Sequence, residues 1–244
     1  MPINEPITMH VVPFSHPCMT ARAGLQHKGL DFEEVMLLPG NQEGKLEGIY
    51  GEGKTTVPGI VVGDETVHSS VAILRYLDEK VPEKPLYPET IAGRVRDAEE
   101  WGDRELQDIA RRLVFGVLHF SPGSMGTFAG AGELDAAGTD FAMKNLHLTW
   151  RYLGLNAVGL TEDLRNLPAV IEKIQGLADE GVIGSDEPTA ADFQVGASCR
   201  VLTTIRDLDP VLDGSAAQRI AFRHFPDYPG EIPAGSFPAT WISF

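Results

Sequence analysis

Apolar and polar positions in the first 80 residues predict short strands that alternate with helices. Ile7–Val12 and Asp31–Leu37 have extended patterns, and a helical pattern runs between them from about Cys18 to Lys28. Gly29 ends this helix, since glycine is the residue that most often follows a helix. Val57–Val62 is typical of a buried strand because it is a short apolar run bounded by turn residues.

A hairpin and a further helix complete this first unit. Gly63–Asp64 predicts a turn, Glu65–Val67 a short partner strand, and Ser69 or Ser70 is suited to cap the helix that follows. The apolar positions of that helix recur at helical spacing, at Val71, Leu74, Tyr76 and Leu77. The stretch 39–53 is rich in glycine and charge and predicts at most a short helix. The order β-α-β, β-β-α therefore predicts an α/β domain over residues 1–81.

Beyond this unit, strand patterns give way to helical periodicity. Pro82, Pro85 and Pro88 stiffen the chain, and we place a linker at residues 82–93. From Arg94 to Phe120 apolar residues recur at the spacing of a helix that faces a core. A glycine-rich interruption at 123–138 precedes three further predicted helices, at about 139–158, 161–180 and 189–207. Residues 94–244 are therefore predicted to form an all-α domain.

Two features near the C-terminus add detail. Thr189–Asp192 predicts a capping box in which an aspartate replaces the usual glutamate, and we interpret it as structural. The chain ends in a tail rich in proline and aromatic residues, Pro226–Phe244. We expect this tail to pack over the body as a strap, because of the aromatic side chains Phe225, Tyr228, Phe237 and Trp241.

Charge and cysteine content exclude several classes of protein. The chain carries 35 acidic and 20 basic residues, a formal net charge of −15, which argues against nucleic acid or an anionic membrane as partner. No apolar run approaches the roughly 20 residues of a bilayer span, and the first residues lack a signal-peptide pattern. Two cysteines, Cys18 and Cys199, lie far apart and predict neither a disulfide nor a zinc site. We therefore expect a cytoplasmic location.

Candidate chemistry lies where the first helix begins. Ser15-His16-Pro17-Cys18 follows the first strand and puts a hydroxyl and a thiol at a helix N-terminus, where free N–H groups and partial positive charge stabilise an anion. As a variant of Cys-x-x-Cys, the motif has Ser15 in the position of the outer, attacking sulfur. Such a site would hold and activate the thiolate of a bound small molecule.

Two other patterns are rejected. Gly48–Thr55 matches the phosphate-loop consensus, but that loop needs a strand before it and a helix after it, and Thr55–Pro58 cannot start a helix. The seven histidines form no H-x-x-x-H or H-E-x-x-H pair, so we predict no metal.

Four landmarks together, in order and spacing, carry a family resemblance. They are Ser15–Cys18 after the first strand, Val57–Pro58 before the third, Val67–Leu77 entering a helix, and Pro188–Asp192 in the second half. On these segments the whole chain resembles the cytosolic glutathione S-transferase family. The resemblance implies a thioredoxin-like N-terminal domain followed by an all-α C-terminal domain, and a homodimer.

The resemblance also implies roles for individual residues. Ser15 falls where the family places its catalytic Ser or Cys, and Cys18 where thioredoxin-like proteins keep a more buried, resolving cysteine. The backbone of Val57 would pair with the cysteine of glutathione, with the bond to Pro58 in cis, and Ser70 would receive the γ-glutamyl carboxylate.

Two neighbours of these residues complete the candidate glutathione site. Where the family has Glu or Gln before the serine, this chain has Ser69, so the acidic partner of the γ-glutamyl ammonium is absent or comes from elsewhere. A related low-molecular-weight thiol is therefore an alternative to glutathione. His16 is interpreted either as a group that orients substrate or as a solvent-facing loop residue.

The resulting hypothesis is a detoxifying transferase that uses glutathione as co-substrate. Ser15 would donate a hydrogen bond to the bound thiolate, which attacks a hydrophobic electrophile. Candidate residues for the electrophile pocket are Phe14, Phe115, His119 and Trp150. Two alternatives stay open: a glutathione-dependent thiol-disulfide oxidoreductase that uses Cys18, and a non-catalytic module kept for binding or dimerisation.

Overall fold

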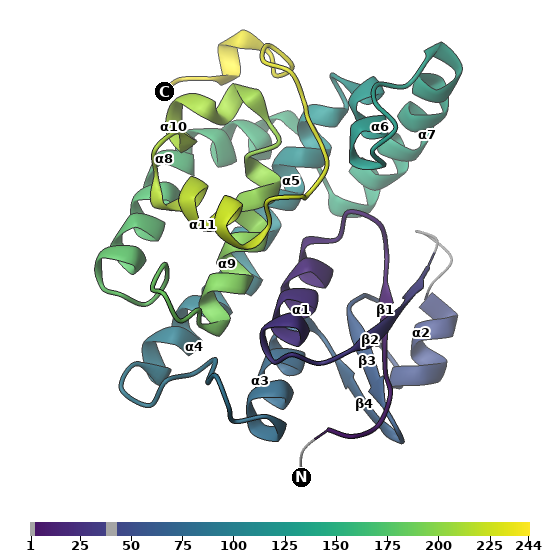
Figure 1. Cartoon of the computed structure of the whole chain (residues 1–244). Coiled ribbons are helices and arrows are strands. Elements are labelled where there is room, and N and C mark those ends of the chain that lie inside the picture. Colours follow the sequence, from purple (N-terminus) through teal and green to yellow (C-terminus); the bar gives the residue numbers. More distant parts are fainter. Residues whose placement is uncertain (1–2, 38–42) are drawn as a thin grey trace.

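The computed structural model describes residues 3–37 and 43–244, in which a four-stranded sheet is followed by helices (Figure 1). The strands are β1 (Ile7–Val11), β2 (Phe32–Met36), β3 (Gly59–Val62) and β4 (Glu65–His68). The helices that accompany them are α1 (His16–His27), α2 (Glu43–Tyr50) and α3 (Ser70–Lys80). The expected order of strands and helices is thus confirmed, and it is that of a thioredoxin-like domain.

The sheet has the strand order β2-β1-β3-β4. β1 runs parallel to β2 and antiparallel to β3, and β3 is antiparallel to β4. Met9 in the centre of β1 pairs with Glu34 on one side and Ile60 on the other, and its side chain is fully buried. The mixed sheet follows from the connections, because a helix links β1 to β2 and a tight turn links β3 to β4.

Helices α1 and α3 cover the same face of the sheet and bury its apolar side chains (Figure 1). The central residues of this core are Ile7, Met9, Val11, Cys18, Ala21, Leu25, Ile60, Val62, Ile73 and Leu77. At the end of α1, the buried ammonium of Lys28 donates to Asp78 at 2.9 Å and to the carbonyl of Val81 at 2.7 Å. This contact fixes the start of the connection that leaves α3.

Helices make up the regular structure of the rest of the chain. Their bounds are α4 (Ala92–Trp101), α5 (Gln107–Leu118), α6 (Met125–Phe128), α7 (Ala136–Leu153), α8 (Ala157–Asp179), α9 (Ala190–Leu202), α10 (Asp209–Leu212) and α11 (Ala216–His224). A π-helical segment, Gly102–Leu106, joins α4 to α5 without a break. The helix expected at 94–120 is therefore present as one continuous helical stretch, from Ala92 to Leu118. Among residues 3–37 and 43–244, none of the helices combines the length and apolar content that a bilayer crossing requires.

Three expectations about local structure need correction or comment. The helix expected to reach Asp207 ends at Leu202, because the chain after it bends to pair Ile205 with Ile232 of the tail. Helix α11 was not expected; it is short, and Ser215 caps it by accepting from the Gln218 N–H at 3.2 Å. In the stretch 39–53, α2 is the short helix, while residues 39–42 lie outside the described residues.

The tail Pro226–Phe244 packs as the expected strap, and the name strap is kept for it below. It runs from the end of α11 along the helices to the C-terminus (Figure 1). Ile232 and Phe237 are buried, and the Phe237 N–H donates to the Asp207 carboxylate at 2.7 Å. The Ile232 N–H donates to the carbonyl of Thr204 at 2.8 Å. Backbone pairing and buried apolar side chains therefore hold the strap against the body.

The predicted capping box at the start of α9 is present. The buried Asp192 carboxylate accepts from the Thr189 N–H at 2.7 Å and from the Gly184 N–H at 2.7 Å, while Thr189 Oγ1 accepts from the Asp192 N–H. A buried N–H without a partner costs about 1–3 kcal/mol. Asp192 therefore stabilises both α9 and the loop that precedes it.

A second buried carboxylate lies at the junction of α3 and α4. Glu99 is fully buried, accepts from the Tyr87 hydroxyl at 2.5 Å and pairs with Arg75 at 3.1 Å. Burial raises the pKa of the Glu99 carboxyl to about 7, although its hydrogen bond from Tyr87 and the charge of Arg75 act in the opposite direction. Its charge state thus changes near neutral pH.

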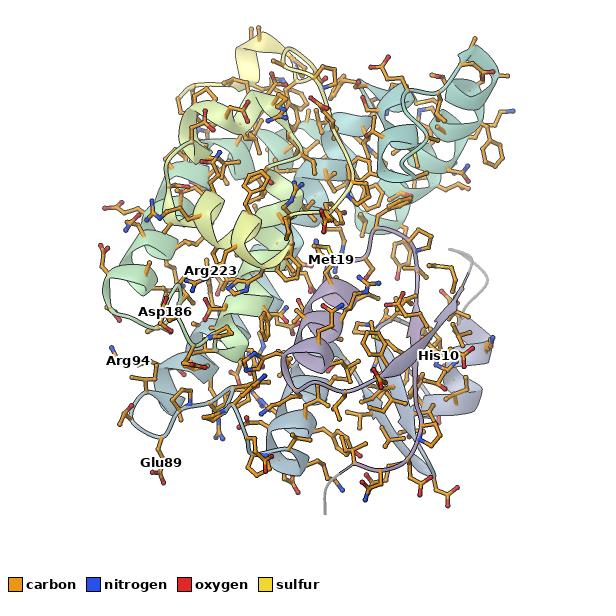
Figure 2. The ribbon with its side chains drawn as sticks, viewed as in Figure 1. His10, Met19, Glu89, Arg94, Asp186 and Arg223 are labelled. Atoms are coloured by element: carbon orange, nitrogen blue, oxygen red, sulfur yellow. The ribbon has the colours of Figure 1, made fainter. Side chains whose placement is uncertain are left out.

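We predict that Asp192→Ala lowers the free energy of unfolding by about 2 kcal/mol, since it leaves the buried Thr189 N–H and the more exposed Gly184 N–H without their acceptor. Urea denaturation followed by circular dichroism measures the change. Asp186→Ala is the control, because Asp186 is fully exposed and its ion pair with Arg223, at the surface in Figure 2, spans 3.3 Å. Equal losses in the two variants would show that the Asp192 contacts add nothing.

The titration of Glu99 predicts a loss of stability as pH rises from about 4.5 to about 7. The unfolded chain releases this proton at the ordinary pKa of 4.5 and the folded chain only near 7, so rising pH favours unfolding within that window. Glu99→Gln should therefore gain stability relative to wild type across the window, in denaturant titrations at several pH values. Glu100→Gln also loses a contact with Arg75 but is half exposed, and its difference from wild type should stay flat. A flat difference for Glu99→Gln would contradict the prediction.

Candidate functional site

Three loops meet at one end of the sheet. His10 of β1 pairs with Gly59 of β3, and Gly59 pairs with His68 of β4. Because these neighbours are antiparallel, the end of β1, the start of β3 and the end of β4 lie together. The segments that follow or precede them are Phe14–Cys18, Val57–Pro58 and Ser69–Ser70. The structure thus brings together the segments that the sequence singles out.

Ser15 is the N-cap of α1. Its Oγ accepts a hydrogen bond from the Cys18 N–H at 3.4 Å, and the helix begins at His16 with Pro17 in its first turn. A hydroxyl has one donor hydrogen and two acceptor lone pairs, so this cap leaves the hydrogen available to another acceptor. Capping the helix and donating to a ligand are therefore compatible at Ser15.

The peptide bond between Val57 and Pro58 is cis, as expected. The carbonyl of Pro58 accepts from the Ser69 N–H at 3.0 Å, and the carbonyl of Thr56 accepts from the His68 ring at 2.8 Å. The loop before β3 is therefore bound directly to the segment that enters α3.

Ser69, rather than Ser70, caps α3. Its backbone has φ 86°, a left-handed conformation that few residues other than glycine adopt, and its Oγ accepts from the Ala72 N–H at 3.3 Å. Ser70 is the first residue of the helix, and only 1% of it is exposed. The N-terminus of α3, with its partial positive charge, therefore lies at the end of the sheet where the three loops meet.

Cys18 lies in the apolar core, not at the surface of the loop cluster. Its exposed fraction is 1%, and it belongs to the core between the sheet and α1. Burial raises the pKa of the Cys18 thiol to about 11, against smaller effects of Ser15 and Arg22 that lower it. This placement argues against a reactive Cys18, because the nucleophilic form of cysteine is the thiolate.

His16 is also buried, so it is not a solvent-facing loop residue. Burial lowers the pKa of the His16 ring to about 3, and the charge of Arg111 on α5 adds to this effect. The ring is therefore neutral over the physiological range.

The expected electrophile residues fall into two groups. Phe14, 42% exposed, packs edge-on against Phe128 of α6, with 5.7 Å between ring centroids. Trp150 stacks with His119 at 4.4 Å and donates from its indole N–H to the carbonyl of Phe115 at 2.8 Å. Phe14 is the residue of the four that borders the loop cluster directly, since it precedes Ser15.

The structure supports the rejection of a phosphate loop at Gly48–Thr55. Helix α2 contains Gly48 and the strand β3 follows the loop, which is the reverse of the strand-loop-helix order that phosphate binding needs. Within the part of the chain that the structure describes, His, Cys, Asp and Glu side chains form no group of three or more suited to a metal ion.

Tyr228 in the strap is a site neighbour that sequence reasoning missed. Its hydroxyl donates to the carbonyl of Phe14 at 3.0 Å, and its ring lies 6.2 Å from that of Phe128. The sequence signals only an aromatic residue in a proline-rich tail, and no local pattern connects it to a loop more than 200 residues earlier.

Comparison with known proteins shows what the first part of the chain is similar to. The family model for the glutathione S-transferase N-terminal domain matches residues 9–85. Glutathione S-transferase Z1 of Arabidopsis thaliana is 45% identical over 76 residues, which are 30% of this chain and 34% of that protein. The match thus spans about a third of the relative's length.

Solved structures share the fold of nearly the whole chain. Glutathione transferase GSTFuA3 from Phanerochaete chrysosporium has a TM-score of 0.62 at 17% identity, and 90% of this chain and 96% of that one are covered. A glutathione S-transferase from Methylobacterium radiotolerans in complex with glutathione sulfonate has a TM-score of 0.59 at 18% identity, with 96% and 99% covered. The chain is thus similar to glutathione S-transferases in the sequence of residues 9–85, and it shares their fold over nearly its whole length.

Proposed function

We propose that this protein is a glutathione-dependent transferase in which Ser15 activates the thiolate of the bound co-substrate. The observation that carries the proposal is the position of Ser15: its hydroxyl caps α1 as an acceptor, a contact that does not use its hydrogen, at the end of the sheet where the Val57–Pro58 and Ser69–Ser70 segments meet. The glutathione sulfonate complex of the Methylobacterium relative supports the choice of co-substrate.

The reaction is a nucleophilic substitution or addition. The thiol of glutathione loses its proton to solvent, and Ser15 donates a hydrogen bond to the resulting thiolate. The sulfur then forms a bond to an electrophilic carbon, and in a substitution the leaving group departs with its electron pair. Ser15 acts before and during the attack, by making the thiolate available at neutral pH.

The available interactions are strong enough for this role. A thiol with a pKa of about 8.5 needs about 2.7 kcal/mol of differential stabilisation to lower that pKa by two units. A hydrogen bond to a charged acceptor contributes roughly 1.5–3 kcal/mol, and a helix N-terminus about 0.3–1 kcal/mol. Ser15 together with the N-terminus of α1 therefore suffices.

The remaining assignments extend the same proposal. The N-terminus of α3 at Ser70 receives the γ-glutamyl carboxylate, and Val57 pairs with the co-substrate through its backbone. Because Ser69 replaces the acidic residue of the family pattern, the γ-glutamyl ammonium is held without that carboxylate, and a related thiol is the second candidate co-substrate. Phe14 beside Phe128 favours a hydrophobic electrophile. We also propose a role in detoxification, a cytoplasmic location and a homodimer, on the family resemblance.

Disulfide chemistry at Cys18 is the less favoured alternative. The buried thiol with a raised pKa would be protonated at neutral pH and closed to a bulky disulfide.

We predict that wild type binds glutathione and lowers the pKa of its thiol, and that Ser15→Ala binds glutathione but raises this pKa by about one to two units relative to wild type. Calorimetric titration measures binding, and thiolate absorbance in the ultraviolet measures the pKa. Turnover of chlorodinitrobenzene should fall in parallel.

Ser215→Ala is the matched control for Ser15→Ala, because Ser215 caps α11 through the same kind of contact. Both variants should lose about 1 kcal/mol of stability, and only Ser15→Ala should change the thiol pKa. If wild type shows no binding at millimolar glutathione, another thiol or a non-catalytic role becomes the better account.

The buried position of Cys18 predicts slow alkylation of the folded protein by iodoacetamide at pH values of about 6 to 8, at a rate close to that of the buried Cys199. Mass spectrometry of the two cysteine peptides over time measures both rates. Cys18→Ala should keep the transferase activity. Rapid labelling of Cys18 at mildly acidic pH would instead favour the oxidoreductase alternative.

A further inference from the structure

The backbone of Phe14 adopts an unfavourable conformation directly before Ser15. Its φ is 63°, in the left-handed region that costs a residue with a side chain free energy unless its surroundings hold it. Ser15 itself is extended, with φ −72° and ψ 110°, as an N-cap requires. The direction of the Ser15 hydroxyl therefore depends on the turn at Phe14.

The strap and α6 each contact this turn. The Tyr228 hydroxyl donates to the carbonyl of Phe14 at 3.0 Å, and the Phe14 ring rests edge-on against Phe128, which in turn contacts the Tyr228 ring. Burial raises the pKa of the Tyr228 phenol, so the hydroxyl stays protonated and remains a donor. Tyr228 therefore holds the backbone of Phe14 through its hydrogen bond, and Phe128, which packs against the Tyr228 ring, holds the Phe14 side chain.

Tyr228 is itself firmly held. The guanidinium of Arg200, buried on α9, donates to the carbonyl of Tyr228 at 2.8 Å and to the carbonyl of Phe225 at 2.8 Å, and it lies 5.7 Å from the centre of the Tyr228 ring. Gly230, two residues after Tyr228, has φ 117° and lies close to Phe128. A Cβ atom at this position would be 2.5 Å from the Phe128 ring.

The helix that follows the turn meets the same residues. Met19 of α1 packs against Ala197 of α9 and Phe225, and Figure 2 shows it where α1 approaches the helical half. The strap therefore acts on the turn at Phe14 through Tyr228, and Phe225, the residue directly before the strap, packs against α1.

We propose that Tyr228 is a positioning residue, whose hydrogen bond to Phe14 holds the turn that directs the Ser15 hydroxyl. Its effect on activity rests on the proposed function of Ser15. The strap is then part of the active enzyme, because it links the helical half of the chain to the residue that contacts the thiolate.

The test is Tyr228→Phe, which removes the hydroxyl and keeps the ring. In the protein without ligand, hydrogen exchange of the backbone amides in residues 12–18 should become about three- to tenfold faster, as expected for the loss of one hydrogen bond. With glutathione, kcat should fall by a similar factor and the pKa of the bound thiol should rise, while KM for glutathione changes less than twofold.

Tyr76→Phe is the matched control. Tyr76 on α3 also donates its hydroxyl to a single partner, Glu65 at 2.6 Å, and that partner lies on the hairpin side of the sheet domain. In Tyr76→Phe, the amide hydrogen exchange of residues 12–18, the kcat and the pKa of the bound glutathione thiol should equal those of wild type. A shift of the same size in both variants would overturn the proposal, since the effect would then be general.

Exchange and kinetics separate this proposal from the proposed function. Unchanged exchange in Tyr228→Phe overturns the positioning role, and so does faster exchange with unchanged kcat and thiol pKa. If wild type fails to bind glutathione, the proposed function is wrong. The hydrogen-exchange result alone then shows whether Tyr228 holds the turn at Phe14.

Discussion

Helix α1 is buried on two sides at once, and the position of the candidate site depends on this. Cys18 and Leu25 point into the core beneath the sheet, while Met19 packs against α9 and Phe225. The Thr20 hydroxyl donates to the carbonyl of Phe193 at 3.2 Å, so the contact with α9 includes a buried hydrogen bond. A helix held in this way has a fixed N-terminus, and the loop before it is placed by both halves of the chain.

Buried charged side chains form hydrogen bonds with the backbone of the connections between helices. Lys28 donates to carbonyls of the connection after α3, Arg200 to carbonyls at the start of the strap, and Asp192 accepts from amides before α9. Connections of this kind have no ladder of backbone hydrogen bonds, and their buried polar groups need other partners. The strongly acidic chain thus uses a few buried side chains of both signs to fix its irregular connections, and Arg200 does so for the strap that reaches Phe14.

Sequence reasoning identified the elements around the site but not the direction of their side chains. The end of the first helix at Gly29, the capping box at Thr189 and the cis bond before Pro58 are each visible locally or through the family pattern, and the structure has all three. Cys18 and His16 are next to the same helix start, yet the structure buries both. Sequence position places a residue on a helix, whereas its exposure depends on what packs against each side.

The sequence by itself determined the order of strands and helices, the caps, and the residues gathered at one end of the sheet, because these follow from periodicity and from contacts within a few positions. Only the tertiary structure decided that Thr20 donates to Phe193, that Cys18 is unavailable to solvent, and that Tyr228 holds Phe14. These contacts join residues far apart in the chain. Their partners are set by the packing of one half against the other, which local preferences do not encode.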